Sequence, residues 1–182
     1  MAGPSGEAPV TGPSIQSLLD TRPCGCGACR EVRTAEIAIG PAPETAIARR
    51  AAGRAVALVG DRNTLAACGA ALAANLRALD VRVVVVTLDH DGTRVHADDR
   101  TATRVKAAVE AIDGDALPVA VGAGTINDLV KAASHELGRR YVAVATAPSM
   151  NGYTSAIAAL TVGGLKSTVP STPPVAVLAD PD

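Results

Sequence analysis

The sequence predicts an α/β fold built on a doubly wound, mostly parallel sheet with helices on both faces. Short runs that are apolar throughout recur along the chain, and single stretches with helical spacing of apolar residues separate them. Such strands are stable only where both faces of a sheet are covered. The chain is also 48% hydrophobic, with two Tyr, no Phe and no Trp, so Ala, Val, Leu and Ile make up nearly all of its apolar content. This composition favours close packing of helices on a sheet.

The first elements follow this alternation. We expect a short strand at residues 37–39, where apolar residues alternate before Gly40. A compact apolar run at residues 56–59 predicts a second strand, and leucines that recur at helical spacing from Leu65 predict the helix after it. The valine run at residues 83–86 predicts a third strand, buried like the second.

The pattern then repeats twice. A helix is expected at residues 101–112, then a strand at residues 119–121 that runs into a glycine turn. The next helix is expected at residues 125–137, closed by Gly138, and a strand at residues 141–145 follows it. Each repeat is the unit of a parallel sheet.

The two ends of the chain do not follow this strand-helix repeat. After a polar stretch, Gly163 and Gly164 predict a hairpin, and residues 175–178 predict a last strand. Residues 1–30 are rich in Pro, Gly and Cys and are expected to be a flexible segment. Residues 31–182 are expected to form one α/β domain.

Charge and hydropathy exclude several classes of partner. Seventeen basic and eighteen acidic residues balance, so no electrostatic footprint for nucleic acid or for an anionic membrane is visible. No apolar run is long enough to span a bilayer, and the first 23 residues do not have the pattern of a signal peptide. We therefore expect a cytoplasmic protein with a small-molecule partner.

The cysteines leave two alternatives open. Cys24, Cys26 and Cys29 are spaced closely enough to hold a metal but lack a fourth ligand at the usual distance, so the alternative is a glycine-rich loop with reduced thiols. Cys68 lies in an alanine-rich helix and is expected to be a small core residue. The histidines lack metal-ligand spacing and are expected to be solvated: His90, His96 and His135.

The segment VAVGAGTINDLVK is the sharpest local feature. A strand runs into Gly122 and Gly124 and opens a helix at once. Glycines let the backbone approach a pyrophosphate, and the amides at a helix N-terminus favour the anion. Asn127 stands where the usual fingerprint has its third glycine, so a plain tight turn remains the alternative to a dinucleotide cradle.

Asp61 has two candidate roles. It follows the strand at residues 56–59 and could accept hydrogen bonds from a ribose diol, which would favour NAD. It could equally cap the following helix. The neighbouring Arg62 could instead favour a 2′-phosphate, so the choice between NAD and NADP stays open.

A polar run follows the strand at residues 141–145, at the end where open α/β sheets place their ligands. It consists of Thr146, Ser149, Asn151, Tyr153 and Ser155. The alternative is an irregular connection whose hydroxyls satisfy its own backbone.

The segments GAGTINDLVK and VATAPSMNGYTSAIAALTVGGLKSTVP, within residues 119–170, resemble the glycerol-1-phosphate dehydrogenase branch of the dehydroquinate synthase-like and iron-containing alcohol dehydrogenase superfamily. The CGCG near Cys24 and the DRNT at Asp61 resemble its cysteine-rich entry and its nucleotide-side loop. The resemblance implies the Rossmann-like N-terminal, nucleotide-binding half of such an enzyme.

The resemblance also implies roles for particular residues. Asn151 stands where the family commonly has a substrate-binding Asp, and it keeps an acceptor oxygen but loses the charge. Lys131 is matched too and would face solvent or a neighbouring carboxylate. The implied cofactor-binding residues are Asp61, Gly122, Gly124, Thr125, Ile126, Asn127 and Asp128, with Thr146, Ala147, Pro148 and Ser149 on the nicotinamide side and Ser155 as a further contact.

The activity that the resemblance implies is hydride transfer between NAD(P)H and dihydroxyacetone phosphate, giving sn-glycerol 1-phosphate. The family's zinc or similar divalent metal is held by one Asp and two His in a following helical domain, and the sequence stops at Asp182 before them. We expect no metal residue here and negligible turnover from the chain as it stands. The alternatives are a non-catalytic nucleotide-binding module and a related enzyme acting on another polyol or sugar phosphate. The oligomeric state stays open, with a homodimer as one arrangement.

Overall fold

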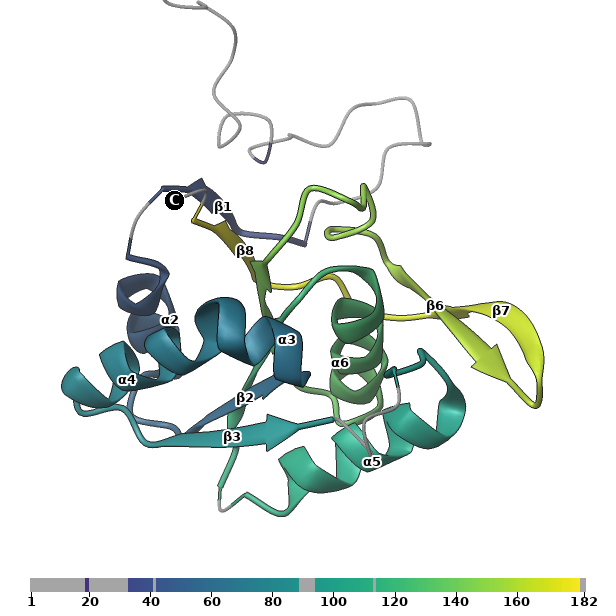
Figure 1. Ribbon diagram of the computed structural model, residues 1–182, viewed down its shortest axis with the longest axis horizontal. Helices are drawn as coiled ribbons and strands as arrows, with labels where there is room; N and C mark the ends of the chain where they lie inside the picture. The colour runs from purple at the N-terminus through teal and green to yellow at the C-terminus, as the bar shows by residue number, and fades with distance from the viewer. Residues whose placement is uncertain (1–18, 20–32, 41, 89–93, 113, 181–182) are drawn as a thin grey trace, which may run out of the picture.

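The computed structural model describes residues 19, 33–40, 42–88, 94–112 and 114–180 (Figure 1). Apart from Leu19, the predicted flexible segment at residues 1–30 lies outside these residues, and so do Cys24, Cys26, Cys29 and His90. No helix in the described part of the chain is both long and apolar enough to cross a membrane.

A six-stranded parallel sheet forms the centre of the domain, which confirms the predicted fold class. Its strand order is β1-β8-β5-β4-β2-β3, and every neighbouring pair is parallel. Burial of the middle strands on both faces explains why their sequences are continuously apolar. The strands are β1 (Glu36–Ile39), β2 (Val56–Gly60), β3 (Val83–Thr87), β4 (Leu117–Val121), β5 (Val142–Ala145) and β8 (Ala176–Ala179).

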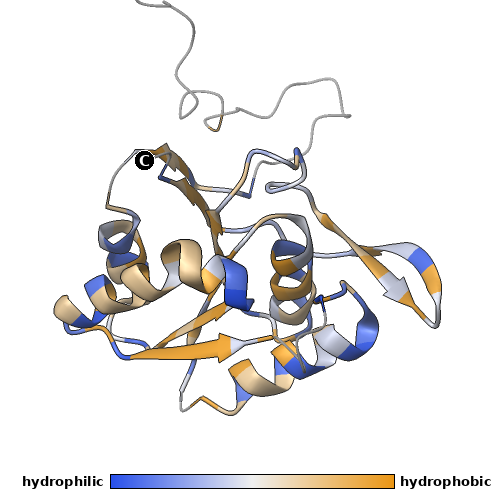
Figure 2. Cartoon of the chain, in the orientation of Figure 1, coloured by the Kyte–Doolittle hydropathy of each residue, from blue (hydrophilic) through white to orange (hydrophobic). Residues whose placement is uncertain are grey.

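Helices cover both faces of this sheet and divide the core in two (Figure 1). One layer contains α2 (Pro43–Ala51), α3 (Arg62–Thr64), a π-helical turn η1 (Leu65–Gly69) and α4 (Ala70–Ala78); the other contains α5 (Asp99–Glu110) and α6 (Gly124–Glu136). Figure 2 shows apolar residues along the strands of the sheet, whereas the helices carry both polar and apolar residues. The helices predicted at residues 101–112 and 125–137 are confirmed as α5 and α6, with their ends shifted by one or two residues. The helix predicted from Leu65 exists too, but it begins with the π-helical turn η1 and is α-helical from Ala70.

Helix α2 was not predicted from the sequence. Its sequence does carry weak helix signals. Pro43 stands in the first turn, where a missing N–H costs nothing, and Glu44 and Arg49 complement the helix dipole. Its apolar face is short and consists largely of alanine, so periodicity alone does not reveal it.

Strand β3 lies at the edge of the sheet, and the prediction that it is buried was wrong. Val83 is buried, but Val84 and Val85 are 36% and 39% exposed. An edge strand pairs on one side only, here with β2, so an apolar run does not guarantee burial on both faces.

The predicted hairpin at Gly163 and Gly164 is confirmed. It joins β6 (Ile157–Val162) and β7 (Leu165–Pro170), which pair antiparallel as a separate two-stranded sheet. Both glycines have positive φ, 56° and 86°, as the turn requires. The hairpin extends away from the body of the domain (Figure 1).

The strand order places a topological switch point between β2 and β4. The chain leaves β2 through α3 and α4 on one face and continues to β3, whereas it leaves β4 through α6 on the other face and continues to β5. The two connections separate and leave a crevice at the carboxyl ends of these strands. The segments that begin at Asp61 and Gly122 both lie at this edge.

Candidate functional site

The turn from β4 into α6 requires glycine at position 122 for steric reasons. A Cβ atom built on Gly122 would lie 2.6 Å from Cβ and 2.8 Å from Cγ1 of Ile126, far inside ordinary contact. Ile126 is itself buried in the core. Gly122 therefore lets the first turn of α6 fold closely back against the strand that precedes it.

The N-terminus of α6 is open. Ala123 is its N-cap residue and provides no side-chain hydrogen bond, so the first amides of the helix lack a capping partner from that residue. A Cβ atom on Gly124 would meet no atom within 4 Å. Exposed amides and the helix dipole together favour an anion at this point.

These residues line a cavity of about 700 Å³ at the switch point. The α6 turn contributes Ala123, Gly124, Thr125 and Ile126 to it, the segment after β2 contributes residues 61–64, and the loop after β5 contributes Thr146 and Ser149. The structure thus brings together three segments that the sequence had indicated separately.

Arg94 and Val95 also line the cavity, and sequence reasoning missed them. They lie between β3 and α5. Because loops that follow parallel strands all emerge at the same edge of the sheet, their position after β3 was the signal that could have found them. With Arg62, Arg94 gives the cavity two guanidinium groups.

Asp61 caps the helix that follows it. Its carboxylate accepts a hydrogen bond from the backbone N–H of Thr64 at 2.8 Å, and the Thr64 hydroxyl accepts one from the Asp61 N–H at 3.0 Å. This is a reciprocal capping box. The cap role is confirmed, and Asp61 still borders the cavity, so the ribose role stays a prediction.

The loop between β5 and β6 folds against the α6 turn. The Tyr153 hydroxyl donates to the carbonyl oxygen of Ala147 at 3.0 Å and lies 3.4 Å from that of Gly122. Pro148 and Asn151 are exposed and do not line the cavity. Of the five residues predicted for this segment's cofactor contacts, Thr146 and Ser149 are those that face it.

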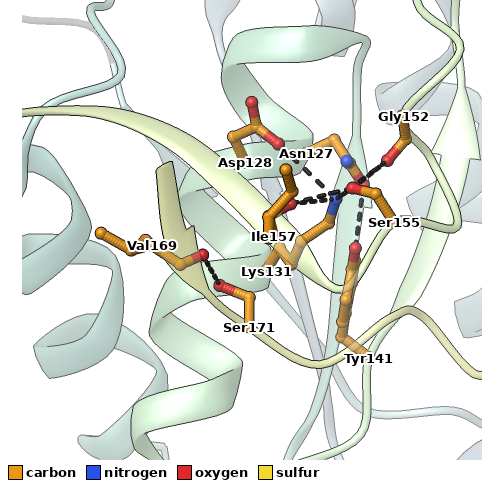
Figure 3. Close-up of polar contacts among 9 residues, drawn as sticks. All are labelled: Asn127, Asp128, Lys131, Tyr141, Gly152, Ser155, Ile157, Val169 and Ser171. Carbon is orange, nitrogen blue, oxygen red and sulfur yellow. Dashed lines mark hydrogen bonds and ion pairs between the residues drawn. The ribbon is translucent and has the colours of Figure 1, made fainter. Parts of the chain in front are cut away.

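Lys131 does not face solvent. Its side chain is completely buried, and its ammonium donates to Gly152 O at 2.9 Å, Ser155 Oγ at 3.0 Å and Ile157 O at 3.1 Å (Figure 3). The carboxylate of Asp128 lies 3.6 Å away, so the expectation of a neighbouring carboxylate is confirmed. Ser155 therefore uses its hydroxyl inside the loop, away from the cavity.

Burial and charge act in opposite directions on this ion pair. Loss of solvent raises the pKa of Asp128, while Lys131 and the Ala159 N–H lower it. Loss of solvent likewise lowers the pKa of Lys131, and Asp128 opposes this. Each charge offsets the free-energy cost of burying the other. Removal of either side chain would therefore leave an unpaired buried charge and destabilise the fold.

Asn127 points into the core. Its Oδ1 accepts a hydrogen bond from the Tyr141 hydroxyl at 3.1 Å, and both side chains are fully buried (Figure 3). Burial, with Asp128 nearby, raises the pKa of Tyr141, so this hydroxyl stays a donor. The residue that replaces the third glycine of the fingerprint thus fastens α6 to the start of β5.

The other candidate groups take no part in this cavity. Cys68 lies partly buried in the π-helical turn against the core beneath α2 and α4, as expected, and burial together with Asp180 raises the pKa of its thiol. His96 and His135 are exposed. Within the described residues, no three His, Cys, Asp or Glu side chains come together in a way that could hold a metal ion.

The family model and the related sequences agree on one family of dehydrogenases. The family model described as iron-containing alcohol dehydrogenase matches residues 37–182. The chain is 36% identical over 124 residues to a glycerol-1-phosphate dehydrogenase (NAD(P)+) of Bacillus velezensis and 36% identical over 162 residues to that of Bacillus licheniformis. These matches cover 68% and 86% of this chain but only 31% and 40% of the relatives. The chain thus corresponds to less than half the length of either.

Solved structures share the fold. An iron-containing alcohol dehydrogenase from Thermotoga maritima superimposes with a TM-score of 0.67 at 16% identity, over 82% of this chain and 46% of that one. A probable glycerol dehydrogenase from Sinorhizobium meliloti gives 0.62 at 21% identity, over 80% and 39%. In each case the likeness extends over the α/β domain described above.

Proposed function

The chain belongs to the iron-containing alcohol dehydrogenase family, and we propose that it binds NAD or NADP in the cavity at the switch point. The observation that carries this proposal is the open N-terminus of α6, which lines a cavity of about 700 Å³ beside a glycine that permits close approach. That volume lies within the range of sites for small molecules and cofactors.

The residues around the cavity suit a dinucleotide. The amides of Gly124, Thr125 and Ile126 would donate to the pyrophosphate, where the helix dipole also favours negative charge. Arg62 and Arg94 add positive charge to the same cavity. A bound nicotinamide supplies a hydride donor or acceptor, and the residues of this chain bind and orient it.

Asp61 bears on the choice between the two nucleotides. A carboxylate has two oxygens and about four lone pairs, so the bond to Thr64 leaves acceptor capacity for a ribose diol. The same charge would repel a 2′-phosphate, whereas Arg62 would attract one. Both side chains border the cavity, so their balance sets the preference.

The substrate proposal is dihydroxyacetone phosphate, reduced to sn-glycerol 1-phosphate. It is supported by the names of the relatives from Bacillus velezensis and Bacillus licheniformis. Asn151 is exposed in the loop that borders the cavity and could offer its amide to the substrate. The described residues do not fit the family's divalent metal, because they bring together no set of three ligating side chains.

Nucleotide titration tests the cofactor proposal. We expect NADH and NADPH to bind the purified chain saturably, followed by nicotinamide fluorescence. Gly124→Asp should abolish binding, since the space around a Cβ there is open and the new carboxylate would occupy the anion position. Thr103→Asp is the matched control, because it places the same charge near the N-terminus of α5, away from the cavity. Equal binding by the two variants would refute the assignment of the cavity.

A turnover assay separates the remaining alternatives. Oxidation of NADH that depends on dihydroxyacetone phosphate would support the substrate proposal. Oxidation with another polyol precursor or sugar phosphate in its place would identify a related dehydrogenase. Binding without turnover on any of these substrates would identify a nucleotide-binding module.

A further inference from the structure

Lys131 is a buried charged side chain that takes no part in the proposed nucleotide contacts. It lies in the middle of α6 and is completely buried, an arrangement that costs free energy unless the charge is compensated. It lies on α6, the helix whose first residues line the cavity.

The contacts of Lys131 lie almost entirely in one loop. An ammonium group has three N–H bonds and no acceptor. Three oxygens at 2.9, 3.0 and 3.1 Å satisfy all of them, and they belong to Gly152, Ser155 and Ile157 (Figure 3). Two of the three are backbone carbonyls, so the lysine holds the path of the chain itself.

The same loop carries part of the cavity wall. It begins at Thr146 and Ser149, which line the cavity, and it passes through Gly152 and Ser155 to Ile157, the first residue of β6. The Ser155 hydroxyl lies 2.9 Å from both Gly152 O and Ile157 O and can donate its one proton to either. The ammonium and this hydroxyl therefore share the same two carbonyl oxygens. Irregular connections of this kind have few ladder hydrogen bonds of their own and depend on such anchors.

Resting on the proposed function, we propose that Lys131 is a positioning residue: its ammonium fastens the loop from Thr146 to Ile157 to helix α6, and so holds Thr146 and Ser149 at the nucleotide. It does not touch the cavity itself. The carboxylate of Asp128, at 3.6 Å, favours the charged form of this ammonium.

Hydrogen exchange of the whole chain, followed by mass spectrometry without nucleotide, measures the first half of this proposal. In Lys131→Met, amides of the loop should exchange about tenfold faster or more, because each lost hydrogen bond to a charged group exceeds the energy of a tenfold change. Amides of β4 and α2 should be unchanged. Lys106→Met is the matched control, since it removes a lysine that pairs with Glu136 at 3.0 Å on the surface.

A milder variant covers the case in which Lys131→Met does not fold. Ser155→Ala removes one of the three partners and leaves the two carbonyls in place. It should speed loop exchange by less than Lys131→Met, and in the double variant the two effects should not add. Loop exchange that stays unchanged in both single variants, or that rises equally over the whole chain, overturns the inference.

Nucleotide affinity tests the second half. The dissociation constant for NADH or NADPH should rise in Lys131→Met and stay the same in Lys106→Met. A loosened loop with unchanged affinity would overturn the positioning role. If the wild-type chain bound neither nucleotide, the proposed function would fail on its own, and the exchange data would still decide whether Lys131 fastens the loop.

Discussion

Gly122→Ala tests how tightly the turn before α6 is packed. The added Cβ would lie 2.6 Å from Cβ of Ile126, where ordinary contacts begin near 3.4 Å. Neither partner can yield cheaply, because the Ile126 Cβ is fixed by the helix backbone and the residue is 2% exposed in the core. The helix must therefore move relative to β4.

The size of the effect follows from this geometry. Forcing one extra carbon into a packed interior costs about 1–3 kcal/mol. For a domain of this size, that loss lowers the melting temperature by roughly 2–12 °C. The displaced turn should also weaken nucleotide binding, since the same amides would receive the pyrophosphate.

Gly124→Ala is the matched control, because a Cβ there meets nothing within 4 Å. Alanine is also the better helix former, so stability should stay the same or rise by up to about 1 kcal/mol. Unfolding in urea followed by circular dichroism suits a chain without Trp. If Gly122→Ala unfolded at the same urea concentration as the wild type, the packing argument would be wrong.

Three further predictions concern single polar groups. Tyr141→Phe should cost about 1–3 kcal/mol in urea unfolding, because it leaves the buried Oδ1 of Asn127 without its donor. Asp61→Asn should keep the cap and change stability by less than about 0.5 kcal/mol, while the ratio of NADH to NADPH affinity falls, as titration with both would show. The pKa of Asp98 is lowered, chiefly by the Thr101 N–H, so its stabilising contribution is present above its ordinary value of 3.8 and is lost as the pH falls through the lower folded value. In Asp98→Asn, the melting temperature should therefore fall less steeply as the pH is lowered below 3.8. An unchanged dependence of melting temperature on acidic pH would contradict this assignment.

The fold was predictable because its signals are local. Apolar runs separated by helical spacing identify the strands and most helices without knowledge of their order. The order β1-β8-β5-β4-β2-β3 is a tertiary property, and it decides which strand is at the edge. The exposure of Val84 and Val85 could not be predicted for this reason, since nothing in the valine run differs from that of a central strand.

The position of the candidate cavity was predictable where its residues come soon after the ends of strands. Gly124, Thr146 and Ser149 do so, and the carboxyl edge of a parallel sheet brings such positions together. Long side chains were harder to place. Nothing local distinguishes Lys131, which is buried under a loop more than twenty residues later, from a half-buried surface lysine such as Lys106.

Helix α6 shows how one short sequence serves several purposes at once. Its first amides face the cavity, and Asn127 faces the core and bonds Tyr141. Lys131, one turn further along, holds the loop through Gly152. A displacement of the helix start would therefore move the core contact and the loop together with the cavity wall. The residue that permits this arrangement is Gly122, since any side chain there would separate the helix from β4.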